Sequence, residues 1–147
     1  MAPRSVPGHW LNLYCSRTEP NANGSRQAAE RRHSVEDTAA ECERLGASVQ
    51  AFVVDCSKRE EIYSAAEKVK KEIGDVSILV NNAGVITAAD LLSTQDHQIE
   101  RMFEVNILAH MWTTRAFLPS MMKNNHGHIV TVASAAGHFV TSFMVAY

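Results

Sequence analysis

Residues 76–84 read VSILVNNAG, and this stretch decides the fold that the sequence predicts. Its first five residues form an apolar run of strand length, and two asparagines, an alanine and a glycine follow at once. Apolar runs of this kind are typical of strands in a parallel sheet whose two faces are covered by helices. We therefore expect a central strand over residues 76–80, with a polar loop at its carboxyl end.

Upstream of this strand, the sequence alternates between a helix pattern and a strand pattern. Residues 34–46 have apolar side chains at helical spacing, with Ser34 and Asp37 as a capping pair at the start and a glycine at the end. The apolar run of residues 49–54 then predicts a strand that ends at Asp55. This part of the chain is therefore predicted to form a helix followed by a strand.

A second helix is predicted directly after this strand. Ser57 and Glu60 fit a capping box at its start, and Gly74 fits its end. Five apolar side chains at helical spacing predict its buried face: Ile62, Ala65, Ala66, Val69 and Ile73.

Downstream, a long helix and a third strand are predicted. The helix begins near Ser93 or Thr94 and ends near Pro119 or in residues 123–127. Its expected inner face consists of Ile99, Phe103, Ile107, His110, Met111 and Thr114. The strand covers residues 128–134, HIVTVAS.

Strands and helices that alternate in this way predict right-handed βαβ units and an α/β fold with a partial doubly wound, Rossmann-like parallel sheet. Ligands bind beyond the carboxyl ends of the strands in such sheets. The polar residues at these ends are Asp55, Asn81, Asn82 and Ser134. Their convergence on one edge predicts a functional site.

Composition excludes several other classes of protein. The net charge of −2 gives no basic surface for nucleic acid or anionic membrane. The three cysteines, Cys15, Cys42 and Cys56, form no metal-binding spacing and indicate reduced thiols. Residues 1–33 are rich in Pro, Asn, Gly, Ser and Arg, contain no apolar run of signal-peptide or membrane-helix length, and are expected to be irregular or disordered.

Three motifs in the predicted order resemble the short-chain dehydrogenase/reductase family. They are VNNAGV at residues 80–85, FEVN at 103–106, and VTVASAAG at 130–137, which is followed by Tyr147 thirteen residues after Ser134. Within that family, residues 34–147 are similar to the 17-beta-hydroxysteroid dehydrogenases of endoplasmic reticulum and lipid droplets, which are close to retinol dehydrogenases. The resemblance implies hydride exchange between NAD or NADP and a secondary alcohol or ketone of a hydrophobic, steroid- or retinoid-like substrate.

The resemblance also implies a role for each matching residue. The cofactor would lie against Asp55, Asn81, Ala83 and Gly84. Asn106 would hold a water in the proton relay, Ser134 would hydrogen-bond the substrate oxygen, and Tyr147 would be the general acid/base.

Each of these residues also has a structural alternative. Asp55 could favour the start of the next helix, residues 81–84 could be an ordinary turn, and Asn106 could be a hydrogen-bonded core amide. Ser134 could be a loop serine. A metal site at His126 and His128 lacks a third ligand, and residues 23–25, Asn-Gly-Ser, fit a flexible turn better than a glycosylation site.

Two further motifs of the family are not found in the sequence. They are the TGxxxGxG turn that holds the pyrophosphate and the lysine of the Tyr-x-x-x-Lys pair. In the strand order of such a sheet, residues 49–54 are third and residues 76–80 fourth, so two strands should separate them. We expect a truncated domain over residues 34–147 that lacks the first two strands and the C-terminal strands, folds poorly and leaves sheet edges exposed.

For this chain alone we expect weak or absent cofactor binding, no activity and a cytoplasmic location. The alternative is a non-catalytic protein that binds full-length subunits or a membrane partner. Co-purification with a full-length relative distinguishes the two. As partners we expect a hydrophobic small molecule and, for assembly, a homo-oligomer or association with full-length subunits.

Overall fold

The structure is a computed structural model that describes residues 10–11, 14–15, 35–139, 141–144 and 147. A helix covers residues 35–44. The other elements, in chain order, are β1 (Trp10–Leu11), β2 (Tyr14–Cys15), β3 (Val53–Val54), α2 (Arg59–Glu72), β4 (Ile78–Asn81), α3 (Asp96–Phe103), the π-helical turn η1 (Glu104–Leu108), α4 (Ala109–Lys123), β5 (His128–Thr131) and the 3-10 turn η2 (Ala135–Gly137).

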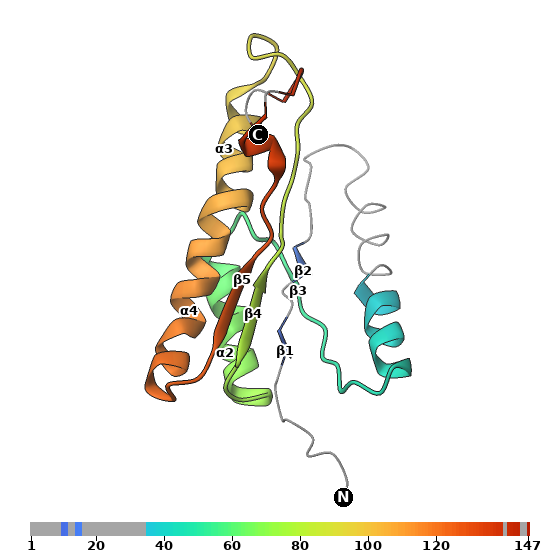
Figure 1. Ribbon diagram of the computed structural model, residues 1–147, viewed down its shortest axis with the longest axis vertical. Coiled ribbons are helices and arrows are strands. Elements are labelled where there is room, and N and C mark those ends of the chain that lie inside the picture. The colour runs from blue at the N-terminus through green and yellow to red at the C-terminus, as the bar shows by residue number, and fades with distance from the viewer. Residues whose placement is uncertain (1–9, 12–13, 16–34, 140, 145–146) are drawn as a thin grey trace, which may run out of the picture.

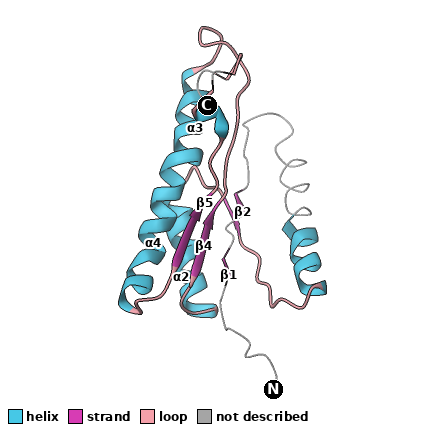
Figure 2. Cartoon of the chain, in the orientation of Figure 1, coloured by secondary structure: helices cyan, strands magenta, loops and turns pink. Residues whose placement is uncertain are grey.

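The strands form two small parallel sheets (Figures 1 and 2). The larger sheet has the order β1-β4-β5, and the smaller pairs β2 with β3. In the larger sheet Ile78 lies opposite His128, and Asn81 lies opposite Thr131. The carboxyl ends of β4 and β5 are therefore at the same height. The prediction of a partial parallel α/β sheet is confirmed.

The amino-terminal segment differs from its prediction at two places. Residues 1–33 were expected to be irregular, but β1 pairs with β4 through Trp10 and Ile78, and β2 pairs with β3 through Tyr14 and Val53. These strands are too short to show a two-residue apolar period, and they give the backbones of β3 and β4 partners that the sequence did not reveal. The other residues of the segment lie outside the described residues.

The core lies where α2 and α4 pack on β3 and β4 (Figure 1). Ile62 and Val69 of α2, Leu79 of β4 and Phe117 of α4 are completely buried there. The predicted apolar face of α2 is confirmed for Ile62, Ala65, Ala66 and Val69, whereas Ile73 follows the end of the helix and is partly buried. The predicted capping box of α2 is wrong, because the helix begins after Lys58 and no side chain caps it.

The long helix begins later than predicted. Ser93 and Thr94 were expected to start it, but their hydroxyls donate to Asp90 instead, in a tight turn. Gln95 and Gln98 form a reciprocal capping box, and the helix runs from Asp96 through η1 to Lys123. Because the Ser93 and Thr94 hydroxyls already have hydrogen-bond partners in this turn, they do not cap the helix. The helix therefore begins after Gln95.

The predicted inner face of this helix is also wrong. Phe103, Ile107 and Met111 are exposed. The buried residues are instead Met102, Val105, Ala109, Thr113, Ala116, Phe117 and Met121. Several of these are small, which lets the helix approach the sheet closely. Both faces of the helix contain apolar residues, so hydrophobicity alone did not distinguish them.

Candidate active site

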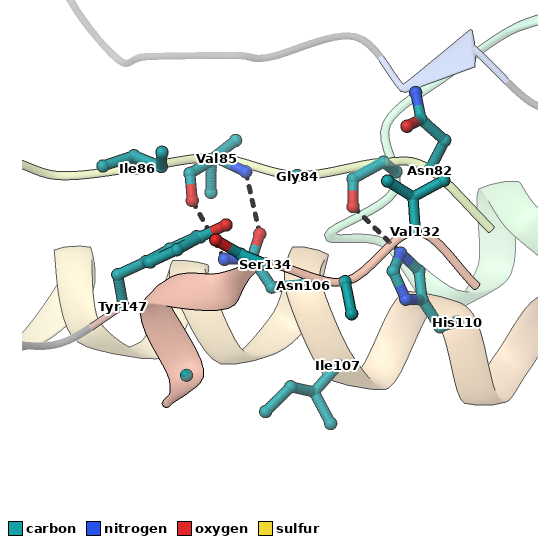
Figure 3. Close-up of a pocket in the computed structure, with 13 residues that line it drawn as sticks. Asn82, Gly84, Val85, Ile86, Asn106, Ile107, His110, Val132, Ser134 and Tyr147 are labelled. Atoms are coloured by element: carbon teal, nitrogen blue, oxygen red, sulfur yellow. Dashed lines mark hydrogen bonds between the residues drawn. The ribbon is translucent and has the colours of Figure 1, made fainter. Parts of the chain in front are cut away.

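A cavity of about 410 Å³ opens beyond the carboxyl ends of β4 and β5 (Figure 3). The loop after β4, the helix that contains η1, the segment after β5 and the residue Tyr147 surround it. Its lining consists of Asn82, Ala83, Gly84, Val85, Ile86, Asn106, Ile107, His110, Val132, Ala133, Ser134, Gly137 and Tyr147. This is the edge at which the sequence predicted a site.

Ser134 and Tyr147 reach this cavity by different routes. Ser134 follows β5 and caps η2, where its Oγ accepts a hydrogen bond of 3.1 Å from the Ala136 N–H. Ala89 and Met144 form a parallel bridge that brings the last described residues beside the loop after β4. The Tyr147 N–H donates to the Met144 carbonyl, and Figure 3 shows the tyrosine ring extending toward Ser134. The predicted serine and tyrosine thus line one cavity.

Asn106 lies in the π-helical turn η1 and joins the helix to the loop after β4. Its Oδ1 accepts from the Val85 N–H at 2.8 Å, and its Nδ2 donates to the Val85 carbonyl at 2.9 Å. The side chain therefore pairs with the loop backbone as a neighbouring strand would. Both polar groups of the amide are hydrogen-bonded within the protein, a structural role that the sequence analysis included only as an alternative. The relay role stays a prediction.

His110 is a pocket residue whose role the sequence analysis missed. Its Nε2 lies 2.9 Å from the carbonyl oxygen of Ala83 (Figure 3). The sequence did contain a signal, because His110 follows Asn106 by four residues and residues at that spacing share a helix face. The sequence analysis instead predicts that His110 packs on the inner face of the helix.

Asn81 and Asp55 do not line the cavity. Asn81 is buried against α4, where its Oδ1 accepts from the Thr113 hydroxyl at 2.7 Å and its Nδ2 lies 3.2 Å from Thr114 Oγ1. Asp55 is buried after β3 and accepts from the backbone N–H and the hydroxyl of Ser57. Their predicted contacts with a cofactor stay predictions.

Among the described residues that line the cavity there is no Asp, Glu, Lys or Arg side chain. Its polar groups are amides, backbone groups, one imidazole and two hydroxyls. These groups can donate hydrogen bonds to a small molecule or accept them from it. Within the described part of the chain, no group of three metal-ligating side chains occurs.

Comparison with known proteins assigns the class. The family model described as "short chain dehydrogenase" matches residues 21–147. Together with the parallel sheet and the cavity at its carboxyl edge, this match shows that the chain belongs to the short-chain dehydrogenase family. The predicted family and fold class are thereby confirmed.

Two relatives are similar to this chain over most of its length. The chain is 71% identical to rat estradiol 17-beta-dehydrogenase 11 over 116 residues, which cover 79% of this chain and 39% of the rat protein. It is 60% identical to human 17-beta-hydroxysteroid dehydrogenase 13 over 116 residues, with the same shares of each chain. The chain thus spans about two fifths of the length of these relatives.

Two solved structures are also similar. A metagenomic short-chain oxidoreductase in complex with NADP has a TM-score of 0.73 and 28% identity, over 80% of this chain and 52% of that one. A short-chain dehydrogenase/reductase from Burkholderia phymatum in complex with NAD has a TM-score of 0.73 and 28% identity, over 79% and 42%. Among the residues described for this chain, no helix combines the length and apolar character that crossing a membrane requires.

Proposed function

We propose that this chain carries the proton-transfer half of a site that interconverts a secondary alcohol and a ketone on a steroid- or retinoid-like lipid, with NAD or NADP as hydride carrier. The observation that supports this most is that Ser134 and Tyr147 line one uncharged cavity at the carboxyl edge of the sheet. The names of the relatives, estradiol 17-beta-dehydrogenase 11 and 17-beta-hydroxysteroid dehydrogenase 13, support a steroid-like substrate.

In this proposal the two hydroxyls act on the same substrate oxygen. The Tyr147 phenol donates its proton to the oxygen when a ketone is reduced and accepts the proton back when an alcohol is oxidised. The Ser134 hydroxyl hydrogen-bonds that oxygen and keeps it within reach of Tyr147. Asn106 would hold a water of the proton relay, through a group other than those that bind Val85.

The described residues fit one end of a nicotinamide cofactor. A cavity of about 410 Å³ is within the usual range for small-molecule sites, and the predicted cofactor residues Ala83 and Gly84 line it. When bound, the nicotinamide supplies the hydride chemistry. The described residues offer no glycine-rich turn at a helix start to hold the pyrophosphate.

A chimera tests the proposed site. The 116 matching residues replace their counterparts in rat estradiol 17-beta-dehydrogenase 11, and turnover of estradiol is compared with that of the unmodified rat protein. We expect the chimera to be active and Ser134→Ala to reduce kcat/KM sharply without changing nucleotide affinity. A folded chimera that binds nucleotide but has no turnover would contradict the proposal.

By itself, the 147-residue polypeptide is proposed to be inactive. Its sequence includes neither the glycine-rich turn nor the paired lysine of the family pattern. Well-oriented placement of reactants supplies about 7 to 11 kcal/mol of a barrier, and acid/base catalysis contributes about 10²- to 10⁴-fold, so both losses are large. Titration of the polypeptide with NADH and NADPH, followed by assay with steroid and retinoid alcohols, tests this. Turnover that Tyr147→Phe abolishes would contradict it.

A second candidate function, favoured by exposed apolar side chains on the long helix, is non-catalytic binding to a full-length subunit. Met111 and Met122 are 61% and 71% exposed, and Phe103 lies on the same helix. Co-expression with the rat relative and affinity purification tests this candidate. Co-purification that Met111→Glu weakens would support it, and absence of association would exclude it.

A further inference from the structure

The loop after β4 is attached to the long helix by side chains rather than by a strand. β4 ends at Asn81, and within the described part of the chain no strand pairs with residues 82–86. Three backbone groups of this loop are instead hydrogen-bonded to the helix. Asn106 binds both groups of Val85, and His110 binds the carbonyl of Ala83 at 2.9 Å.

The chemistry of the Ala83 contact determines which ring nitrogen of His110 carries a proton. A carbonyl oxygen can only accept, so the proton of this hydrogen bond belongs to His110 Nε2. The neutral ring is then the Nε2–H tautomer, and the imidazolium also donates from Nε2. The bond therefore exists in both protonation states. Because its Nε2 proton is used in this way, the ring is suited to holding the loop.

We propose that His110 is a positioning residue that, together with Asn106, fixes the loop of residues 83–85 and so one wall of the cavity that Ser134 also lines. The two side chains lie one helical turn apart and bind loop groups two residues apart, so both restrain the same short segment of the loop. The relevance of this wall to catalysis rests on the proposed function, whereas the attachment itself does not.

Amide hydrogen exchange in the 147-residue chain tests the attachment without any need for turnover. In His110→Leu, the Val85 amide, which His110 does not touch, should exchange about threefold to tenfold faster, while α2 amides keep their rates. In His110→Gln, whose amide nitrogen replaces Nε2, the rate should stay within about twofold of the original. His110→Asn, which is too short, should behave like His110→Leu.

The matched control is His97→Leu, since His97 is an exposed histidine of α3 and the change should leave the Val85 rate unaltered. Proton–nitrogen NMR of the neutral imidazole should place the proton of His110 on Nε2. An unchanged Val85 rate in His110→Leu, equal rates in the Leu and Gln variants, or a proton on Nδ1 would each overturn the proposal. If the exchange and NMR results are as expected but the chimera is inactive, only the proposed function is contradicted.

Discussion

Asn81 shows how much one side chain does for the structure beneath the cavity. It is 4% exposed and links β4 to α4 through hydrogen bonds with Thr113, Thr114 and the His110 carbonyl. These bonds explain why a polar residue is tolerated between an apolar strand and a helix. Asn81 therefore supports the helix that positions Asn106 and His110, although it does not line the cavity.

Replacing Asn81 with alanine should lower the free energy of unfolding by about 1 to 3 kcal/mol, because the hydrogen bonds of its buried amide to Thr113 and Thr114 on α4 would be lost. Urea denaturation followed by circular dichroism measures the change. The control is Asn124→Ala, since Asn124 binds Asp75 at the surface and should contribute at most about 0.5 kcal/mol. Equal effects for the two variants would contradict the assigned role of Asn81.

Gly127 is required for close packing between the end of α4 and β5. A Cβ there would lie 2.5 Å from Met121 Cγ and 2.7 Å from Met121 Cβ, and Met121 is buried. Gly127→Ala should therefore cost about 1 to 3 kcal/mol of stability, whereas Gly137→Ala, which meets nothing within 4 Å, should change it by less than about 0.5 kcal/mol. Thermal unfolding compares the two, and a neutral Gly127→Ala would disprove the close contact.

At this scale the sequence predicted part of the site. The family resemblance, through the thirteen-residue spacing of Ser134 and Tyr147, implied that both act at one site. Both line one cavity, and their roles stay predictions. The same sequence did not reveal the role of His110, because its partner is the carbonyl of Ala83, and a backbone group has no sequence signature. Contacts of side chains with loop backbones depend on tertiary structure, which residue spacing alone does not report.

At the scale of elements, the predicted ends of two helices were accurate, whereas the predicted starts of α2 and α3 were not. Gly46 and Gly74 have φ angles of +90° and +104° at the ends of their helices, as expected for glycines that end a helix. The face of the long helix was predicted wrongly because its apolar residues surround it, and tertiary contacts choose which of them are buried. The strands β1 and β2 have only two residues each, too few to show a pattern.

The turn before α3 is an element whose order should depend on pH. Hydrogen bonds from the side chain and backbone of Ser93 hold the pKa of Asp90 below its ordinary value. A carboxyl whose folded-state pKa is lowered stabilises the turn above the ordinary aspartate pKa, and this contribution is lost as pH falls through the folded pKa. The turn should therefore loosen only in acid.

NMR amide shifts of Leu92 and Ser93, followed from neutral pH to about pH 2, test this prediction. They should titrate with a midpoint below the ordinary aspartate pKa. In Asp90→Asn, whose amide oxygen can accept the same N–H bonds without a charge, this transition should disappear. A midpoint at or above the ordinary value, or a transition that persists in Asp90→Asn, would contradict the role of the carboxylate.

At the scale of the whole molecule, the two parallel sheets and the helices α2 and α4 form a core below a cavity whose walls come from distant parts of the chain. Alternation of strands and helices was sufficient to predict the parallel α/β arrangement and the sheet edge beyond which the cavity opens, but not the pairing of β1 with β4 and of β2 with β3. Apolar side chains remain exposed on the long helix. This is the surface to which the second candidate function assigns a protein partner.

The central claim is that Tyr147 is the proton donor and acceptor of this cavity, and estradiol turnover by the chimera with and without Tyr147→Phe tests it most directly. We predict that Tyr147→Phe lowers kcat by about 10²- to 10⁴-fold with unchanged nucleotide affinity, because only the phenolic proton is lost. Tyr63→Phe, on α2 and away from the cavity, is the matched control and should retain full activity. A chimera that keeps its turnover after Tyr147→Phe would contradict the account.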